Sequence, residues 1–105
     1  MEQIHDFREL IVWQKSHKLF LAVIKEVEAF PKTRAAGIVT DQLLRASGSI
    51  GANIAEGFGR RQGKEYLHYL IIGRGSAMET MNWLITCDDM GWISRMKFAD
   101  MGSMI

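Results

Sequence analysis

Asn53 and Glu56 are the side chains best suited to chemistry, because both are polar and stand in an apolar stretch of sequence. A polar group that is buried in such a stretch must find hydrogen-bonding partners. A structural polar network is the interpretation that the neighbouring residues favour. Its predicted members are Gln42, Ser49, Asn53, Glu56, Ser76 and Glu79. A catalytic Glu56 would need a cleft and a second titrating group, and the sequence offers no candidate for that group.

A second set of residues is basic. Residues 32–74 contain seven basic residues against three acidic ones, although the whole chain has a formal net charge of +1. Some of them fall at a predicted turn between two helices, where the free N–H groups of a helix start favour anions. Five candidates could contact the phosphates of a nucleic acid: Arg45, Arg60, Arg61, Lys64 and Arg74. The alternative is an ordinary charged turn, and the residues alone leave both open.

Other kinds of site have little support. The motif Gly57-x-Gly59 follows a predicted helix, whereas the glycine fingerprint of a dinucleotide site follows a strand. His5, His17 and His68 lie on three different segments, without carboxylates or cysteines at metal-ligand spacing. We therefore expect no catalytic residue, no metal site and no cofactor, and we identify no small-molecule substrate.

Helices must position these residues, because apolar residues recur at spacings of three and four and no alternating strand pattern is sustained. The first predicted helix covers about residues 7–29, after an Asp6 cap and before Pro31, and a loop follows at residues 32–37. The second runs from a Thr40 or Asp41 cap to about residue 58, the third covers about 64–90 and ends at Gly91, and a short fourth helix begins at a Ser94 cap. Residues 57–63 are predicted to form a turn. The residues of the first helix predicted to face inward are Leu10, Trp13, His17, Phe20, Ile24 and Val27.

The second and third helices carry small residues inside them, at 46–52 and 73–77. Each glycine in a helix costs about 1 kcal/mol relative to alanine, so a compensating interaction is expected. We expect the two small-residue patches to face each other, which would let the helix axes approach to about 8 Å. The inward apolar lines are predicted to be Val39, Leu43, Ala46, Ile50 and Ile54 in the second helix, and Tyr66, Leu70, Gly73, Ala77, Thr80, Leu84 and Cys87 in the third.

Composition favours a globular protein. The 105 residues are 48% hydrophobic and 24% charged, and a chain of this length has room for one domain, residues 1–105. No membrane-spanning stretch or signal peptide is visible, and the single cysteine, Cys87, cannot form an internal disulfide. We therefore expect an all-α bundle in the cytoplasm, without a membrane partner.

Several motifs resemble those of one known family. They are Gln42-x-x-Arg45-Ala46, Ser49-Ile50-x-x-Asn53-Ile54-Ala55-Glu56-Gly57-x-Gly59-Arg60, Tyr66-x-x-Tyr69-Leu70 and Gly75-Ser76-x-x-Glu79-Thr80. The sequence is similar in these motifs to the bacterial four-helix-bundle family of the 23S ribosomal RNA intervening-sequence proteins, which is related to the accessory proteins of diversity-generating retroelements. The similarity covers about residues 7–93, and its Asn-Ile-Ala-Glu-Gly core is the most specific part.

The resemblance implies an antiparallel up-down-up-down bundle, a homopentamer, an association with RNA or ribonucleoprotein, and no enzymatic activity. Family members usually have a longer fourth helix than residues 94–105 can form. We therefore expect a non-enzymatic, oligomeric, ribosome-associated protein that binds RNA or DNA through its basic residues. The alternative is a protein-interaction adaptor or scaffold that does not bind nucleic acid.

Overall fold

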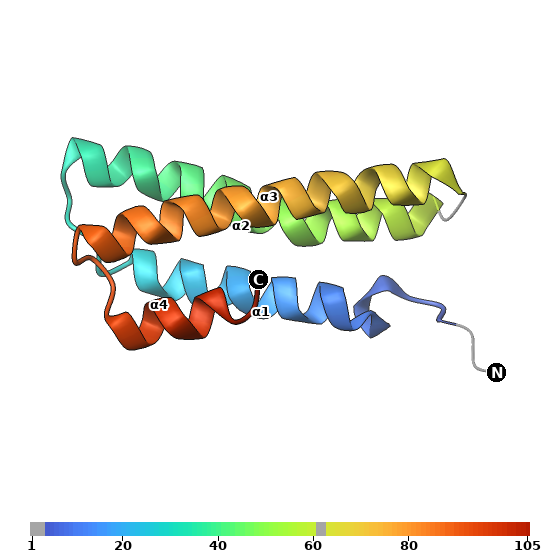
Figure 1. Cartoon of the computed structure of the whole chain (residues 1–105), viewed down its shortest axis with the longest axis horizontal. Coiled ribbons are helices and arrows are strands. Elements are labelled where there is room, and N and C mark those ends of the chain that lie inside the picture. Colours follow the sequence, from blue (N-terminus) through green and yellow to red (C-terminus); the bar gives the residue numbers. More distant parts are fainter. Residues whose placement is uncertain (1–3, 61–62) are drawn as a thin grey trace.

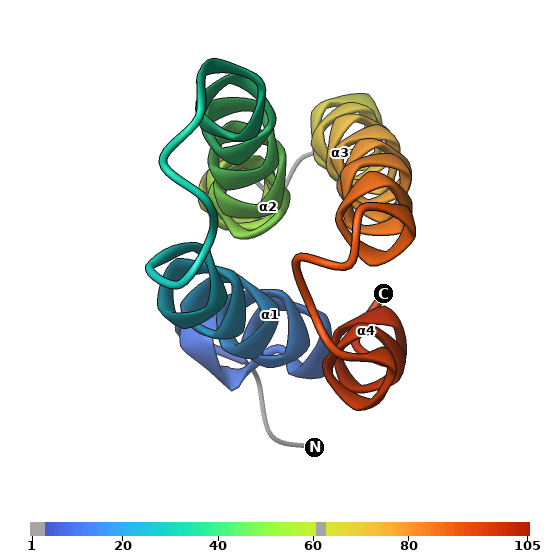
Figure 2. The same cartoon turned by 90° about the vertical axis from the view of Figure 1, so that its left-hand side faces the viewer.

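The computed structural model describes residues 4–60 and 63–105, which form four α-helices and a short 3-10 helix without a strand. The α-helices are α1 (Ile11–Val27), α2 (Arg34–Arg60), α3 (Lys64–Asp89) and α4 (Arg95–Gly102). Successive helices run antiparallel (Figure 1), and seen end-on they occupy the four corners of a bundle (Figure 2). The predicted all-α bundle with a short fourth helix is therefore confirmed. Within these residues, no helix combines the length and apolar character needed to cross a lipid bilayer.

The first predicted helix is divided into two. Asp6 accepts a hydrogen bond from the Arg8 N–H at 2.8 Å and so begins the 3-10 helix η1 (Phe7–Glu9). Leu10 then adopts an extended conformation, with ψ of 126°, and α1 begins at the next residue. The Asp6 cap is confirmed, but it starts η1 and not the long helix.

The inward face of α1 differs from the prediction. Its fully buried residues are Ser16, Leu19 and Val23, whereas His17 and Ile24 are exposed. The α1 sequence is apolar on several sides, so helical spacing alone admits more than one inward face. Only the packing of the other helices decides between these faces.

The start of α2 lies earlier than predicted. The Thr33 hydroxyl accepts a hydrogen bond from the Ala36 N–H at 3.2 Å, which satisfies one of the free donors at the helix start. The predicted caps, Thr40 and Asp41, lie inside α2. Gly37 suggested a loop, but in the structure it forms part of the first turn of α2.

The end of α2 lies later than predicted. Gly57 and Gly59 remain helical, and α2 continues to Arg60. Gly57 is buried against α3, where a Cβ atom would come within 2.9 Å of the Tyr69 Cβ. Gly63 has a φ of 50°, which favours glycine, so this residue supplies the reversal before α3. Gly57 therefore serves close packing and not the turn.

The small residues of α2 and α3 do not form one facing seam. A Cβ atom at Gly48 would meet the Phe20 ring at 3.1 Å, and one at Gly51 would meet the Ser16 hydroxyl at 3.1 Å, so both glycines face α1. Gly73 does face α2, because a Cβ atom there would lie 3.5 Å from the Ile50 carbonyl oxygen, whereas a Cβ atom at Gly75 would meet nothing within 4 Å. The prediction was therefore wrong for the α2 glycines, which make room for α1 side chains.

A glycine turn connects α3 to α4. Gly91 has a φ of 71°, its N–H donates to the Asp88 carbonyl at 3.0 Å, and the Trp92 N–H donates to the Cys87 carbonyl at 2.9 Å. This pair of bonds is the Schellman arrangement that satisfies free carbonyls at a helix end. Ser94 then caps α4 by accepting a hydrogen bond from the Lys97 N–H, as predicted.

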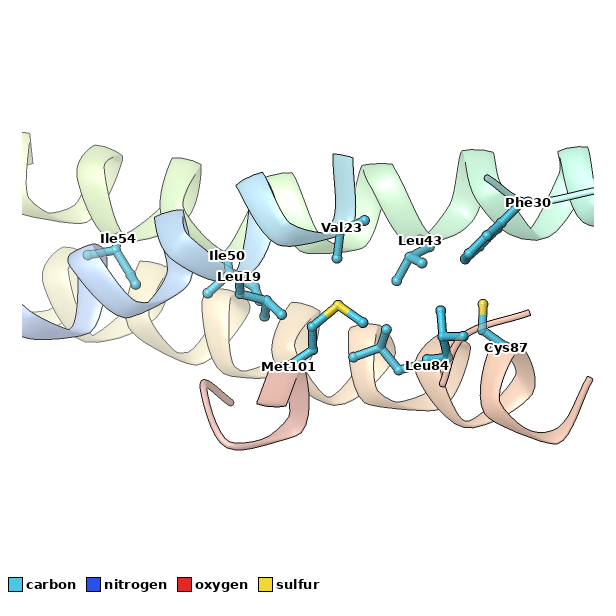
Figure 3. Packing of buried hydrophobic residues seen from close by; sticks show 10 residues of the cluster. Leu19, Val23, Phe30, Leu43, Ile50, Ile54, Leu84, Cys87 and Met101 are labelled. Carbon is cyan, nitrogen blue, oxygen red and sulfur yellow. The ribbon is translucent and has the colours of Figure 1, made fainter. Parts of the chain in front are cut away.

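The core lies among all four helices, at the end of the bundle that contains α4. Its most deeply buried large side chains include Leu19, Leu43, Leu84 and Met101, each no more than 2% exposed. Met101 reaches from α4 into the cluster formed by the other helices (Figure 3). The predicted apolar line of α2 is confirmed, since Leu43, Ala46, Ile50 and Ile54 are buried, and Gly73, Thr80, Leu84 and Cys87 are buried on α3.

Candidate functional site

Arg60, the last residue of α2, is held by a set of neighbours at the α2–α3 end of the bundle. Its Nε atom lies 3.1 Å from the Glu56 carboxylate, and its Nη1 atom lies 3.7 Å from the Glu65 carboxylate. The guanidinium also lies 5.4 Å from the centroid of the Tyr69 ring. The hydrogen bond with Glu56, followed by the charges of Tyr69 and Glu65, raises the pKa of Arg60. Arg60 is therefore permanently charged and oriented.

Lys64 is the first residue of α3 and follows Arg60, the last residue of α2, by four positions. The preceding Gly63 supplies no side-chain cap, so no side chain at that position covers the positive end of the α3 dipole. In the part of the chain that the structure describes, Lys64 forms no ion pair. Arg61, the third basic residue predicted at this turn, lies outside the described residues. The structure thus brings Arg60 and Lys64 together at one end.

Arg45 lies farther along the seam between α2 and α3. Its guanidinium donates to Gln42 at 2.9 Å and to the Glu79 carboxylate of α3. Glu79 also accepts a hydrogen bond from the Trp83 indole N–H at 3.4 Å. Fifteen positions separate Arg45 from Arg60, which corresponds to about 22 Å along a helix. Arg45 is therefore neutralised by Glu79 and distant from the basic pair at the α2–α3 end.

Arg74 lies on another side of α3. It lines a groove together with Lys15 of α1, although the two residues are far apart in sequence. Ser76, two positions later, points instead to α2, and two positions in a helix differ by about 200°. The five predicted basic residues therefore do not form one patch among the described residues. Arg60 and Lys64 form a pair, while Arg45 and Arg74 stand apart.

The polar side chains predicted as a network lie in three groups. Ser49 is the centre of the first group, because its hydroxyl accepts hydrogen bonds from the Asn53 amide at 2.9 Å and from the Ser76 hydroxyl at 3.0 Å. Asn53 also donates to the Ser49 carbonyl at 2.8 Å. The second group is Gln42 and Glu79, which meet through Arg45. Both groups connect side chains along the α2–α3 seam.

Glu56 forms the third group and is not buried, contrary to the prediction. Its side chain is 51% exposed and bonds Arg60 on the same helix, four residues away. The α2 sequence around Glu56 is apolar, but the residues that α2 buries there are Ile54, Gly57 and Phe58. Glu56 therefore lies on the surface, with a cation as its neighbour and no enclosing cleft.

Metal ligation has no geometric basis in the part of the chain that the structure describes. No group of three or more His, Cys, Asp or Glu side chains there could hold a metal ion. Cys87 is buried in the core, and this burial raises the pKa of its thiol to about 11. A buried thiol with a raised pKa is a poor nucleophile.

Two surface features were missed by the sequence prediction. One is a row of aromatic rings on η1 and α1, where the Trp13 and His17 rings stack with centroids 4.7 Å apart and Phe7 meets Trp13 edge-on at 5.1 Å. The spacing of four between Trp13 and His17 could have indicated it. The other is the groove of Lys15 and Arg74, which no local pattern reveals because it joins different helices.

Comparison with known proteins adds a family. The model of the 23S rRNA-intervening sequence protein family matches residues 8–105, which is most of the chain and includes all four α-helices. No curated protein matches the chain. The family match agrees with the observed four-helix fold and with the motifs that run from α2 into α3. The chain therefore belongs to the family of 23S rRNA-intervening sequence proteins.

Proposed function

We propose that this protein is a non-enzymatic helical bundle that binds RNA through the α2–α3 end. The observation that carries the proposal is that Arg60 lies over the Tyr69 ring at the α2–α3 end, where Lys64 begins α3 and forms no ion pair among the described residues. His68 adds an exposed ring that lies 5.5 Å from the partly buried Tyr69 ring and edge-on to it. Cations next to aromatic rings suit single-stranded nucleotides, whose phosphates pair with the cations and whose bases stack on the rings.

The ion pairs of Arg60 are compatible with this role. Its side chain and those of Glu56 and Glu65 are each about half exposed. Exposed ion pairs contribute only about 0–1 kcal/mol, so a phosphate could replace a carboxylate at little cost. The surface position of Glu56 also favours a non-enzymatic role, because a general base usually needs an enclosed site with a shifted pKa. The family description names 23S rRNA, which makes structured ribosomal RNA the first probe.

Fluorescence anisotropy with a labelled 23S rRNA hairpin tests the proposal. We expect the Arg60→Ala, Lys64→Ala double variant to lose affinity and to reduce the slope of log affinity against log salt by about 1.4–1.8, since two phosphate contacts are removed. The exposed His68→Ala substitution should weaken binding without changing that slope. Lys18→Ala with Lys25→Ala, two exposed lysines of α1, is the matched control and should leave both quantities unchanged.

Two results would contradict the RNA proposal. One is no binding at low salt, and the other is binding that the Arg60 and Lys64 substitutions leave unchanged. Pull-down of a protein from cells after nuclease treatment, lost in the same double variant, would favour the adaptor alternative instead.

An apolar stripe on the outer face of α3 supports the oligomer part of the proposal. Leu67, Ile71, Met78 and Ile85 are each between 45% and 58% exposed. Their spacings of four, seven and seven residues place them on one face of α3. We propose that this stripe contacts another copy of the chain. Light scattering should then report a mass above that of one chain, and Ile71→Glu with Met78→Glu should lower it to one chain. A single-chain mass for the unmodified protein would refute this contact.

A further inference from the structure

A groove between three helices has an apolar floor and no acidic lining. Its lining comes from α1, α2 and α3 and from the residues after α4, and its volume is about 280 Å³. The apolar lining residues include Val12, Ile50, Ile54, Leu70, Ala77 and Met104. Val12 is 51% exposed, so a large side chain at the rim has no cover within the described residues.

The groove lies beyond the C-terminal end of α4, in the direction of the helix axis. α4 occupies the fourth corner of the bundle (Figure 2), and the chain after it reaches the groove through Met104 and Ile105. The eight residues of α4 are about 12 Å long, the 17 residues of α1 about 25 Å, and the 26 residues of α3 about 39 Å. Beyond α4, about 13 Å of α1 and 27 Å of α3 therefore border this corner. A helix of about 9–18 residues matches these lengths.

The charged side chains that line the groove are both positive. Lys15 of α1 and Arg74 of α3 line it, and its lining contains no Asp or Glu side chain. Within residues 4–60 and 63–105, neither cation forms an ion pair or a side-chain hydrogen bond. An occupant that packs on the apolar floor and also pairs with these two cations must carry negative charges beside an apolar face.

We propose that this groove binds an acidic amphipathic helix from a different protein chain. The apolar face of that helix packs on Val12, Leu70 and Ala77, and its acidic side chains flank this face and pair with Lys15 and Arg74. The mode is the familiar one of an amphipathic helix in a hydrophobic groove, with anchors at successive turns. The bound helix extends the fourth corner along α1 and α3 and so covers the exposed Val12 side chain.

Two synthetic 18-residue helical peptides test the proposal. Both carry leucines at positions i, i+4, i+7 and i+11; one has glutamates beside the leucines, and the other has lysines at the same positions. Anisotropy of the labelled peptides should show binding of the glutamate peptide, and binding of the lysine peptide should be at least tenfold weaker. The affinity of the glutamate peptide should fall as salt rises, because the rim charges are solvent-accessible.

A charge exchange in the protein sharpens the test. Lys15→Glu with Arg74→Glu should weaken the glutamate peptide about tenfold and strengthen the lysine peptide. Lys18→Glu with Lys25→Glu changes the net charge equally on the same bundle and should leave both affinities nearly unchanged. Val12→Glu, at a half-exposed position, should weaken the glutamate peptide while circular dichroism reports an unchanged helix content.

Three outcomes would overturn the proposal. Equal affinity for the two peptides would show that the charges do not select the occupant. If the glutamate peptide binds unchanged to the Lys15→Glu, Arg74→Glu double variant and also to the Val12→Glu variant, the peptide binds elsewhere on the protein. Light scattering that shows Val12→Glu dissociating an oligomer would mean that a second copy covers the groove. Arg60→Ala with Lys64→Ala should not affect the peptide, so the RNA proposal can fail separately.

Discussion

Gly57 offers the sharpest test of how α2 and α3 pack. A Cβ atom at this position would lie 2.9 Å from the Tyr69 Cβ and 3.4 Å from the Tyr66 carbonyl oxygen. Neither contact involves the flexible end of a side chain, so Gly57→Ala must move one helix relative to the other. Overpacking of this kind costs about 1–3 kcal/mol, and the rigid contact favours the upper half of that range.

The helix propensity of alanine acts in the opposite direction. Replacing a helical glycine by alanine gains about 1 kcal/mol where the new methyl group fits. Gly57→Ala should therefore lose about 1–2 kcal/mol of unfolding free energy. Gly75→Ala is the matched control, since Gly75 also lies within a helix but has nothing within 4 Å of a Cβ atom, and it should gain about 0.5–1 kcal/mol. The two variants should thus differ by about 1.5–3 kcal/mol in unfolding free energy.

Urea unfolding followed by circular dichroism at fixed protein concentration measures this difference, because association of subunits would otherwise shift the midpoint. In thermal unfolding, each 1 kcal/mol should correspond to about 4–8 °C for a chain of this size. If Gly57→Ala is stabilised as much as Gly75→Ala, the close approach at Tyr69 is wrong and the packing account of Gly57 must be abandoned.

Two further predictions concern titrating groups. Burial raises the pKa of the Cys87 thiol to about 11. A thiol reagent at pH 8 should therefore label Cys87 only as fast as the protein opens. Rapid labelling under native conditions would contradict the burial of Cys87. The side-chain and backbone hydrogen bonds from Arg8 lower the pKa of Asp6 to about 2. Asp6 should therefore contribute stability to η1 above its ordinary pKa near 4 and lose this contribution as pH falls towards 2. The Arg8 amide signal in nuclear magnetic resonance should titrate in that acid range, and Asp6→Asn should abolish the titration; a midpoint near 4 would argue against the cap.

Helix number, helix type and much of the core could be predicted from the sequence. In α2 the apolar residues form one narrow line, so helical spacing selects a single inward face, and Leu43, Ile50 and Ile54 are buried as predicted. On α3 the predicted line includes the buried Leu84, although α3 also carries a second apolar stripe that is exposed. α1 behaved differently, because it is apolar on several sides and its neighbours decide that Leu19 points inward. The predicted boundaries of α2 were wrong at Gly37 and Gly57. A glycine favours a turn locally, but in this fold both glycines lie within the helix.

The sequence predicted which residues belong to the candidate site but not which of them contact one another across helices. The basic residues and the polar residues of the α2–α3 seam were found, and Ser49, Asn53 and Ser76 do form hydrogen bonds with one another. The sequence could not show that Glu79 neutralises Arg45, since these residues belong to different helices. Sequence reasoning also placed Glu56 in an apolar environment, whereas its side chain is exposed in the structure. The packing of α2 against α3 decides which side of α2 is buried, and the sequence does not show that packing.

The sequence by itself determined a four-helix protein of the 23S rRNA-intervening sequence family, with Pro31, Gly91 and Ser94 marking helix ends. Local chemistry is sufficient for these features, because caps, helix breakers and helical spacing act over a few residues. Only the tertiary structure decided that Glu79 neutralises Arg45 and that Arg74 joins Lys15 in a groove. Those groupings depend on how separate helices pack, and packing is set by side chains that are distant in sequence.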